Sequence, residues 1–237
     1  IAIEFDGLYW HSDRFKDKFY HINKTKDCEE KGIRLIHIFE DEWLEKKEIV
    51  ESRLKNLLGL NSRRIGARKT IIKEITPKDK NLFLDTYHIQ GKDNSNVKLG
   101  AFHEDELIGV MTFAKPRVFM GKKAVEGTWE LTRFATVADT YTPGLASKML
   151  KYFERGWSPK VIESFADRRW SRGNLYKQLG FDLVSETQPN YFYFKDNKKR
   201  YHRYKFRKSE LKGFENYSPD KTEKQIMDEA GWFRIYD

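Results

Sequence analysis

The feature that most constrains the fold is a short, nearly continuous apolar run at residues 33–39, Ile-Arg-Leu-Ile-His-Ile-Phe. A run of this length and composition predicts a strand that is covered on both faces. The pattern also predicts a strand at residues 1–6, a helix from Asp13 to about Gly32 and a helix over residues 43–58. This order predicts a parallel pair of strands with a helical crossover, and therefore an α/β fold.

Residues 60–70 are polar and basic, which favours a linker. We therefore divide the chain into a partial first domain (1–60), a basic linker (61–71), a mixed α and β domain (72–208) and a helical tail (209–237). Strands are expected at 73–75, 97–103, 107–114, 129–136, 161–166, 191–194 and 200–206, and helices at 78–88, 144–154, 173–179 and within 218–230.

Several classes of protein are excluded by composition. The 237 residues contain no apolar run of about 18 residues that could span a membrane, and an aromatic content of 15% argues against disorder. The single cysteine, Cys28, excludes an internal disulfide framework and a cysteine-rich zinc site, so we expect a reducing cytoplasm.

The positive charge is concentrated in particular stretches. The net charge is +9, and residues 168–208 hold 12 Lys and Arg against 3 Asp and Glu. Such a local excess of positive charge favours a polyanionic partner, and we expect double-stranded DNA. The alternative is a basic surface that only keeps the protein soluble. A strand at residues 200–206 would place the cations at 203, 205 and 207 on one face. The predicted DNA-binding residues are Arg63, Arg64, Arg68, Lys69, Arg168, Arg169, Arg172, Arg203, Lys205 and Arg207.

Two carboxylates and a histidine lie together near the start of the chain. The strand period places Glu4 and Asp6 on one face, and the turn at Gly7 brings His11 to the end of that strand. Carboxylates hold hard divalent cations, and a histidine can transfer a proton near neutral pH, so this group favours metal-dependent hydrolysis of a phosphodiester. We expect the carboxylates to raise the pKa of His11. The alternative is a strand end with a surface histidine.

The same region resembles the very-short-patch-repair endonucleases and, more closely, the phage-type homing endonucleases of the restriction-endonuclease-like fold. The motifs are Glu4-x-Asp6-Gly7-x-x-Trp10-His11, Tyr20-His21-x-x-Lys24, Gly32-Ile33-x-Leu35-Ile36 and Phe39-Glu40-Asp41-Glu42-Trp43. The resemblance implies a Mg²⁺ cofactor with Asp6 and Glu4 as metal residues, and His11 as the catalytic histidine. It also implies an upstream strand carrying the chelating aspartate, so the chain is expected to be part of a longer one.

His21 and Lys24 lie on one side of a predicted helix, where they could contact the scissile phosphate. With His11, Glu4 and Asp6 they complete the predicted catalytic set. The alternative is that they belong to a solvated helix face.

A second group of candidate site residues lies at the predicted turn before residues 144–154. A turn of small residues that opens a helix exposes backbone N–H groups to a pyrophosphate. With Leu-Gly-Phe at 179–181, it resembles the acetyltransferase superfamily, which implies an α+β fold and coenzyme A contacts at Gly144, Ala146 and Ser147. Tyr141 stands where that family carries a donor side chain, so we expect weak or no binding of acetyl-coenzyme A.

These observations predict a Mg²⁺-dependent DNA endonuclease of the homing or repair type, encoded by a phage, whose second domain binds DNA or serves as a scaffold. The alternatives are an acyl-coenzyme-A-dependent acetyltransferase and a non-catalytic DNA-binding fragment.

Overall fold

The computed structural model describes residues 1–116, 125–196 and 199–237. The chain forms two compact units: unit 1 comprises residues 1–45 and 183–237, and unit 2 comprises residues 46–182. The predicted boundaries at 60, 71 and 208 differ from this division. Lys198, which belongs to the basic stretch, lies outside the described residues. Within those ranges no helix is long and apolar enough to cross a membrane.

Unit 1 begins with a parallel strand pair. β1 (Ala2–Asp6) pairs with β2 (Leu35–Phe39), and α1 (Tyr20–Glu30) connects them. The predicted parallel pair with a helical crossover is confirmed, although the helix begins at Tyr20 rather than Asp13. All five residues of β2 are buried, as the apolar run predicts. Two paired strands do not establish the predicted restriction-endonuclease-like sheet.

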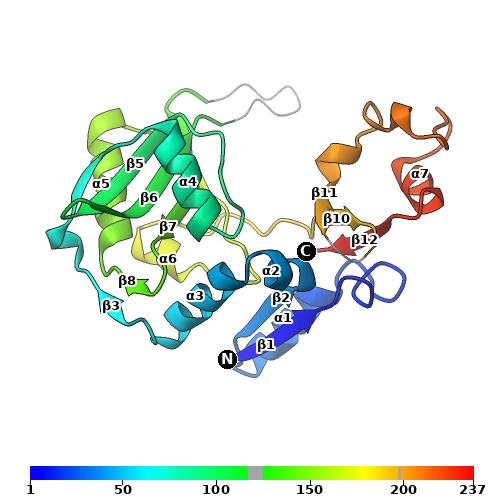
Figure 1. Cartoon of the computed structure of the whole chain (residues 1–237), viewed down its shortest axis with the longest axis horizontal. Coiled ribbons are helices and arrows are strands. Elements are labelled where there is room, and N and C mark those ends of the chain that lie inside the picture. Colours follow the sequence, from blue (N-terminus) through cyan, green and yellow to red (C-terminus); the bar gives the residue numbers. More distant parts are fainter. Residues whose placement is uncertain (117–124, 197–198) are drawn as a thin grey trace. The chain divides into compact units, whose positions relative to one another are not determined.

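The end of the chain completes unit 1 (Figure 1). β10 (Tyr191–Phe194) lies between β11 (Arg200–His202) and β12 (Phe233–Tyr236), and both pairings are antiparallel. The short helix α7 (Glu223–Glu229) begins with a capping box at Thr222. Residues from the two ends of the chain share one core, formed by Leu8, Phe39, Phe194 and Ile235.

One predicted helix and one predicted strand are each divided. The helix expected over 43–58 is two helices, α2 (Glu40–Glu45) and α3 (Lys47–Leu58), and the division between the units falls between them. The strand expected over 200–206 ends at His202, because Arg203–Phe206 form the 3₁₀ helix η2. Arg203, Lys205 and Arg207 therefore do not share one face of a strand, which corrects that prediction.

Unit 2 is built on a mixed five-stranded sheet. Its order is β4 (Ile71–Glu74), β5 (Val97–His103), β6 (Glu106–Ala114), β7 (Thr128–Thr136) and β9 (Val161–Ser164). The first three pairings are antiparallel, and β7 and β9 are parallel. The crossover between these parallel strands contains α5 (Leu145–Trp157).

Helices cover both faces of this sheet. Leu145, Met149 and Phe153 of α5 pack against β5, β6 and β7 in the main core, whereas Phe83 and Leu84 of α4 (Pro77–Tyr87) pack with Val110 from the opposite face of β6. A further helix, α6 (Asn174–Gln178), follows β9. The mixed α/β class is therefore confirmed.

The residues expected to form a linker are part of unit 2. β3 (Arg63–Arg64) pairs with β8 (Thr140–Tyr141), and the 3₁₀ helix η1 (Ala67–Lys69) leads into β4. Between them, Ile65 is buried in the main core. Strand pairing and the burial of Ile65 together fix this polar segment to the body of the unit.

Candidate functional site

The predicted catalytic residues of β1 lie on its buried side. Asp6 is fully buried and Glu4 is partly buried, whereas Ile3 and Phe5 are about half exposed on the other face. Because β2 runs parallel to β1 with Glu4 opposite His37, a histidine from the second strand lies on the same inner side. The strand period therefore places the carboxylates together, as predicted, and adds a histidine that the prediction omits.

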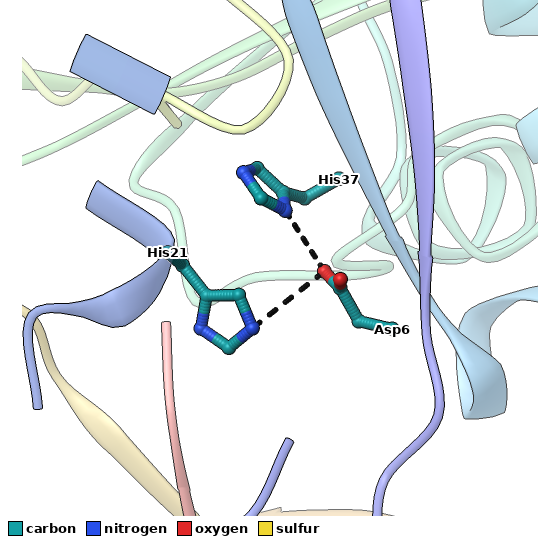
Figure 2. A group of neighbouring side chains, drawn as sticks. All are labelled: Asp6, His21 and His37. Atoms are coloured by element: carbon teal, nitrogen blue, oxygen red, sulfur yellow. Dashed lines mark hydrogen bonds and ion pairs between the residues drawn. The ribbon is translucent and has the colours of Figure 1, made fainter. Parts of the chain in front are cut away.

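Three histidines surround Asp6. His37 Nδ1 lies 3.0 Å and His21 Nε2 lies 3.9 Å from Asp6 Oδ2 (Figure 2). His11 Nδ1 lies 3.3 Å from Asp6 Oδ1 and 2.9 Å from His21 Nε2. We call Glu4, Asp6, His11, His21 and His37 the histidine–carboxylate cluster. The structure thus brings His11, His21, Glu4 and Asp6 together, as the sequence predicts.

The turn after β1 and the start of α1 position two of these histidines. The backbone N–H of His11 donates to the carbonyl of Gly7 at 3.1 Å, which turns the chain back beside the strand end. His21 lies in the first turn of α1 and is buried. The planes of the two imidazoles are nearly parallel, with centroids 5.2 Å apart.

Burial sets the protonation of this cluster. Removal from water lowers the pKa of His11, and this effect exceeds the opposing influence of Asp6 and Glu4. Burial, together with the neighbouring His37 and His11, lowers the pKa of His21 to about 3. Asp6 and Glu4 do act to raise the pKa of His11, as expected, but the expectation of a raised pKa overall is wrong because burial outweighs them. Neutral imidazoles have a free lone pair at neutral pH, so they can accept a proton or bind a metal.

The outer contacts of the cluster involve Lys24 and Thr25. Lys24 Nζ donates to Glu4 Oε1, and this contact raises the pKa of Lys24. Lys24 is thus paired with a carboxylate of the cluster. Thr25 Oγ1 lies 3.0 Å from His37 Nε2.

His37 is the member that the sequence did not identify. Its only sequence signal is a polar residue inside an otherwise apolar strand, and such a histidine is usually a satisfied core residue. The acids after this strand have structural roles: Glu40 accepts the N–H of Leu8 at 2.9 Å, and Asp41 and Glu42 both bind Arg200.

Unit 2 contains a basic cavity of about 990 Å³ beside α5. We call it the basic cavity. Its lining residues are Ala67, Arg68, Thr70, Ile71, Ile72, Gly144, Ser147, Lys148, Lys151, Tyr152 and Arg155. The described lining residues include four cations and no carboxylate, so the cavity suits an anionic ligand.

The pattern of α5 explains why these cations gather. Its apolar residues, among them Met149 and Phe153, form the buried stripe, which leaves Lys148, Lys151 and Arg155 outside it. Lys148 Nζ donates to the carbonyls of Ala67 (2.9 Å) and Thr70, so it ties η1 to the helix. Lys151 and Arg155 are exposed.

The residues predicted to contact coenzyme A occupy different environments. Gly144 is the N-cap of α5 with a positive φ of 77°, a conformation that glycine adopts without strain. Gly144 and Ser147 line the basic cavity, whereas Ala146 is buried in the core of unit 2. The first turn of a helix also leaves backbone N–H groups without intrahelical acceptors, which favours an anion there. Tyr141 is exposed on β8.

Several of the predicted DNA-binding cations are paired with acids. Arg63 Nη2 lies 2.6 Å from Glu106, Arg169 Nη2 lies 2.9 Å from Asp167, and Arg207 Nη2 lies 3.0 Å from Glu210. Arg168 and Arg172 also take part in interactions with other groups. The remaining predicted residues, all exposed, are Arg64, Arg68, Lys69, Arg203 and Lys205, and Arg68 lines the basic cavity.

Comparisons with known proteins give one family and several solved structures. The model of the Mom protein family matches residues 69–232. No curated protein matches the chain.

Several of the matched structures are titled as acetyltransferases. A GNAT-family acetyltransferase from Streptococcus pneumoniae TIGR4 is 17% identical, with 48% of this chain and 88% of that chain covered and a TM-score of 0.36. A ribosomal-protein-alanine N-acetyltransferase from Brucella melitensis biovar Abortus 2308 is 17% identical, with 50% and 95% covered and a TM-score of 0.35. An aminoglycoside acetyltransferase from an uncultured soil metagenomic sample is 12% identical, with 51% and 93% covered and a TM-score of 0.35.

These findings correct the main functional prediction. The Mom family is associated with phage DNA modification, and the titles above name acetyltransferases. The predictions of an endonuclease, a hydrolase and a magnesium cofactor are therefore wrong, and so is the expectation of weak or no binding of acetyl-coenzyme A. The imidazole-rich cluster agrees with this correction, because Mg²⁺ prefers oxygen ligands. The findings support the acyl-transfer alternative better than the endonuclease. They are also compatible with DNA as a partner and with a phage origin.

Proposed function

The chain belongs to the Mom protein family, and we propose that it modifies DNA by transferring an acyl group from an acyl-coenzyme A bound in the basic cavity of unit 2. The family is associated with phage DNA modification, which supports DNA as the acceptor. The observation that carries the proposal is the cavity itself, which combines four lining cations with Gly144 and Ser147 at the start of α5.

The chemistry of coenzyme A matches this cavity. Its pyrophosphate and its ribose phosphate carry several negative charges, and Arg68, Lys151 and Arg155 supply exposed positive charges. The backbone at Gly144 and the hydroxyl of Ser147 add polar groups at the start of the helix. A volume of about 990 Å³ is at the upper end of the range for small-molecule sites, about 300–1,000 Å³. The sequence resemblance to acetyltransferases at this turn supports the same ligand.

The proposed reaction is an acyl transfer to a nitrogen of a DNA base. An exocyclic amine attacks the thioester carbonyl, an N–C bond forms, and the C–S bond breaks with release of the coenzyme A thiol. The amine loses a proton to a base or to water, and no oxidant or reductant is required.

Exposed cations near the cavity support DNA as the second ligand. Arg64 and Lys69 lie just before and after the cavity residue Arg68 in sequence, and both are exposed. Such cations hold phosphates without reading the sequence, so the affinity for DNA should fall steeply with salt. Arg203 and Lys205 of unit 1 remain predicted phosphate contacts, but they lie on η2 and not on a strand.

Titration calorimetry with acetyl-coenzyme A tests the first step. We expect micromolar binding by the wild-type chain and no measurable binding by Gly144→Glu, because the new carboxylate would lie among the phosphates and would strain the left-handed backbone. Gly213→Glu is the control, because a side chain there would meet open space. A folded wild-type protein that does not bind acetyl-coenzyme A would contradict the proposal, as would unchanged binding by Gly144→Glu.

A further inference from the structure

The three side chains of Figure 2 come from three different elements of unit 1. Asp6 lies at the end of β1, His21 at the start of α1 and His37 in the middle of β2. One oxygen of Asp6 and one nitrogen of each histidine all lie within 4.8 Å of one another. All three residues are buried, so this arrangement is part of the interior of the unit and not a chance group of surface residues.

The carboxylates of the cluster are incompletely satisfied. Among the described residues, Asp6 Oδ1 and Glu4 Oε2 are buried atoms without a hydrogen-bond partner. Asp6 is fully buried, and imidazole nitrogens of His11, His21 and His37 lie within 4 Å of its carboxylate oxygens. A buried carboxylate oxygen without a hydrogen-bond partner is costly, and a bound cation would remove that cost.

We propose that Asp6, His21 and His37 bind one divalent transition-metal ion of the class represented by Zn²⁺. Imidazole nitrogen suits zinc, iron, nickel and copper, whereas magnesium and calcium prefer oxygen. Tetrahedral coordination at about 2.0–2.1 Å requires ligand atoms about 3.3 Å apart. The observed separations from Asp6 Oδ2 are 3.0 Å to His37 and 3.9 Å to His21, and the two histidine nitrogens lie within 4.8 Å of each other, so changes of up to about 1.5 Å in these separations would suffice.

Outer contacts orient the ligands for this role. Thr25 Oγ1 lies 3.0 Å from His37 Nε2, so the hydroxyl can accept a hydrogen bond from the Nε2–H group and leave the Nδ1 lone pair for the metal. Lys24 holds Glu4 beside the site. Thr25 and Lys24 therefore hold His37 and Glu4 in position around the site.

His11 defines the open side of the proposed site. Its Nδ1 lies 2.9 Å from His21 Nε2, and its side chain is partly exposed. A fourth coordination position would therefore lie toward His11, where either this imidazole or a water molecule can occupy it.

Metal titration of the tag-free full chain tests the proposal in the absence of DNA and acyl-coenzyme A. Competition for Zn²⁺ against a chromogenic chelator should give one tightly bound ion per chain. Co²⁺ should produce the visible absorption bands of a tetrahedral nitrogen and oxygen site. Mg²⁺ at the same concentration should displace neither ion. Absence of both stoichiometric Zn²⁺ binding and the Co²⁺ bands from the folded wild-type protein would overturn the proposal.

Substitutions locate the ion. His21→Asn and His37→Asn should each weaken Zn²⁺ binding at least tenfold, and circular dichroism reports whether each variant is folded. His202→Asn removes an exposed histidine of the same unit outside the cluster and should leave binding unchanged. Equal affinity in folded His21→Asn and wild type would place the ion elsewhere. Because acetyl-coenzyme A binding is measured separately, failure of this test leaves the proposed function standing, and the reverse also holds.

Discussion

The two units collect opposite kinds of polar group. In unit 1, the histidine–carboxylate cluster presents nitrogen and oxygen lone pairs in the interior. In unit 2, the basic cavity presents cationic donors at the surface along α5. Buried lone pairs are best satisfied by one compact cation, whereas dispersed surface cations suit an extended anion. The comparison shows that net charge alone, +9 for the chain, does not identify either ligand.

The largest expected effect comes from reversing charge in the basic cavity. The double substitution Lys151→Glu with Arg155→Glu should weaken acetyl-coenzyme A binding by about a hundredfold or more, since hydrogen bonds to charged groups contribute about 1.5–3 kcal/mol each. Zn²⁺ binding should not change. Calorimetry measures both affinities, and Lys78→Glu with Lys177→Glu is a control of equal charge outside the cavity lining. Similar losses in both double variants would show that only overall charge matters.

The second expected effect is acid destabilisation of unit 2 through His88. Burial, followed by the charges of Arg133 and Arg53, lowers the pKa of His88 to about 3. The unfolded chain binds this proton near pH 6.5 and the folded chain only near pH 3, so stability is complete above pH 6.5 and falls as the pH decreases. The expected slope is about 1.4 kcal/mol per pH unit.

Urea titrations between pH 7 and pH 4 measure this slope. His88→Gln should flatten it, and His103→Gln, in the same unit, should not. An unchanged pH dependence in His88→Gln would contradict the assignment.

A third effect concerns the outer contact of the proposed metal site. Thr25→Val keeps the size of the side chain and removes the hydroxyl that faces His37 Nε2, so Zn²⁺ affinity should fall about tenfold. The chelator competition described above measures it. Thr86→Val is a matched control, because the hydroxyl of Thr86 donates to the carbonyl of Leu82 within its own helix, away from the cluster. If Thr25→Val binds Zn²⁺ as wild type does, the hydroxyl does not orient His37.

The smallest effect is backbone strain at the start of α5. Gly144→Ala adds a Cβ in ordinary contact with Ala67, at 3.5 Å, so the cost arises from the positive φ and should be about 1–2 kcal/mol. Thermal or urea unfolding measures it, and Gly66→Ala, where the backbone is extended, serves as control. A Gly144→Ala variant as stable as the wild type would show that the turn changes its backbone conformation to accept the side chain.

Local signals explain which parts of the fold could be predicted. The cap formed by Thr76 and Pro77 indicates the start of α4, and the apolar run at residues 33–39 indicates β2. Both signals arise from residues that are adjacent in the sequence. The prediction of a strand up to residue 206 is wrong because alternating basic and aromatic residues fit both a strand and the 3₁₀ helix η2. The packing of Phe206 in the core decides between the two.

Tertiary pairings explain the rest. The carboxylate that neutralises Arg63 is Glu106, 43 residues away, and no local pattern indicates it. His37 joins the cluster only because β2 pairs with β1 in a register that places it opposite Glu4. The group around Glu4, Asp6 and His11 was predictable because strand period and one turn suffice to bring it together. The basic cavity was predictable only in part, because Arg68 reaches it from a segment expected to be a linker.

The central claim is that this chain transfers an acyl group to DNA. The most direct measurement is mass spectrometry of nucleosides from DNA incubated with the tag-free protein and acetyl-coenzyme A that carries ¹³C in its acetyl group. The account predicts a new nucleoside that contains the label, free coenzyme A thiol in equal amount, and loss of both with Lys151→Glu and Arg155→Glu. Release of the thiol without a labelled nucleoside, or unmodified DNA in the presence of protein that binds acetyl-coenzyme A, would contradict it.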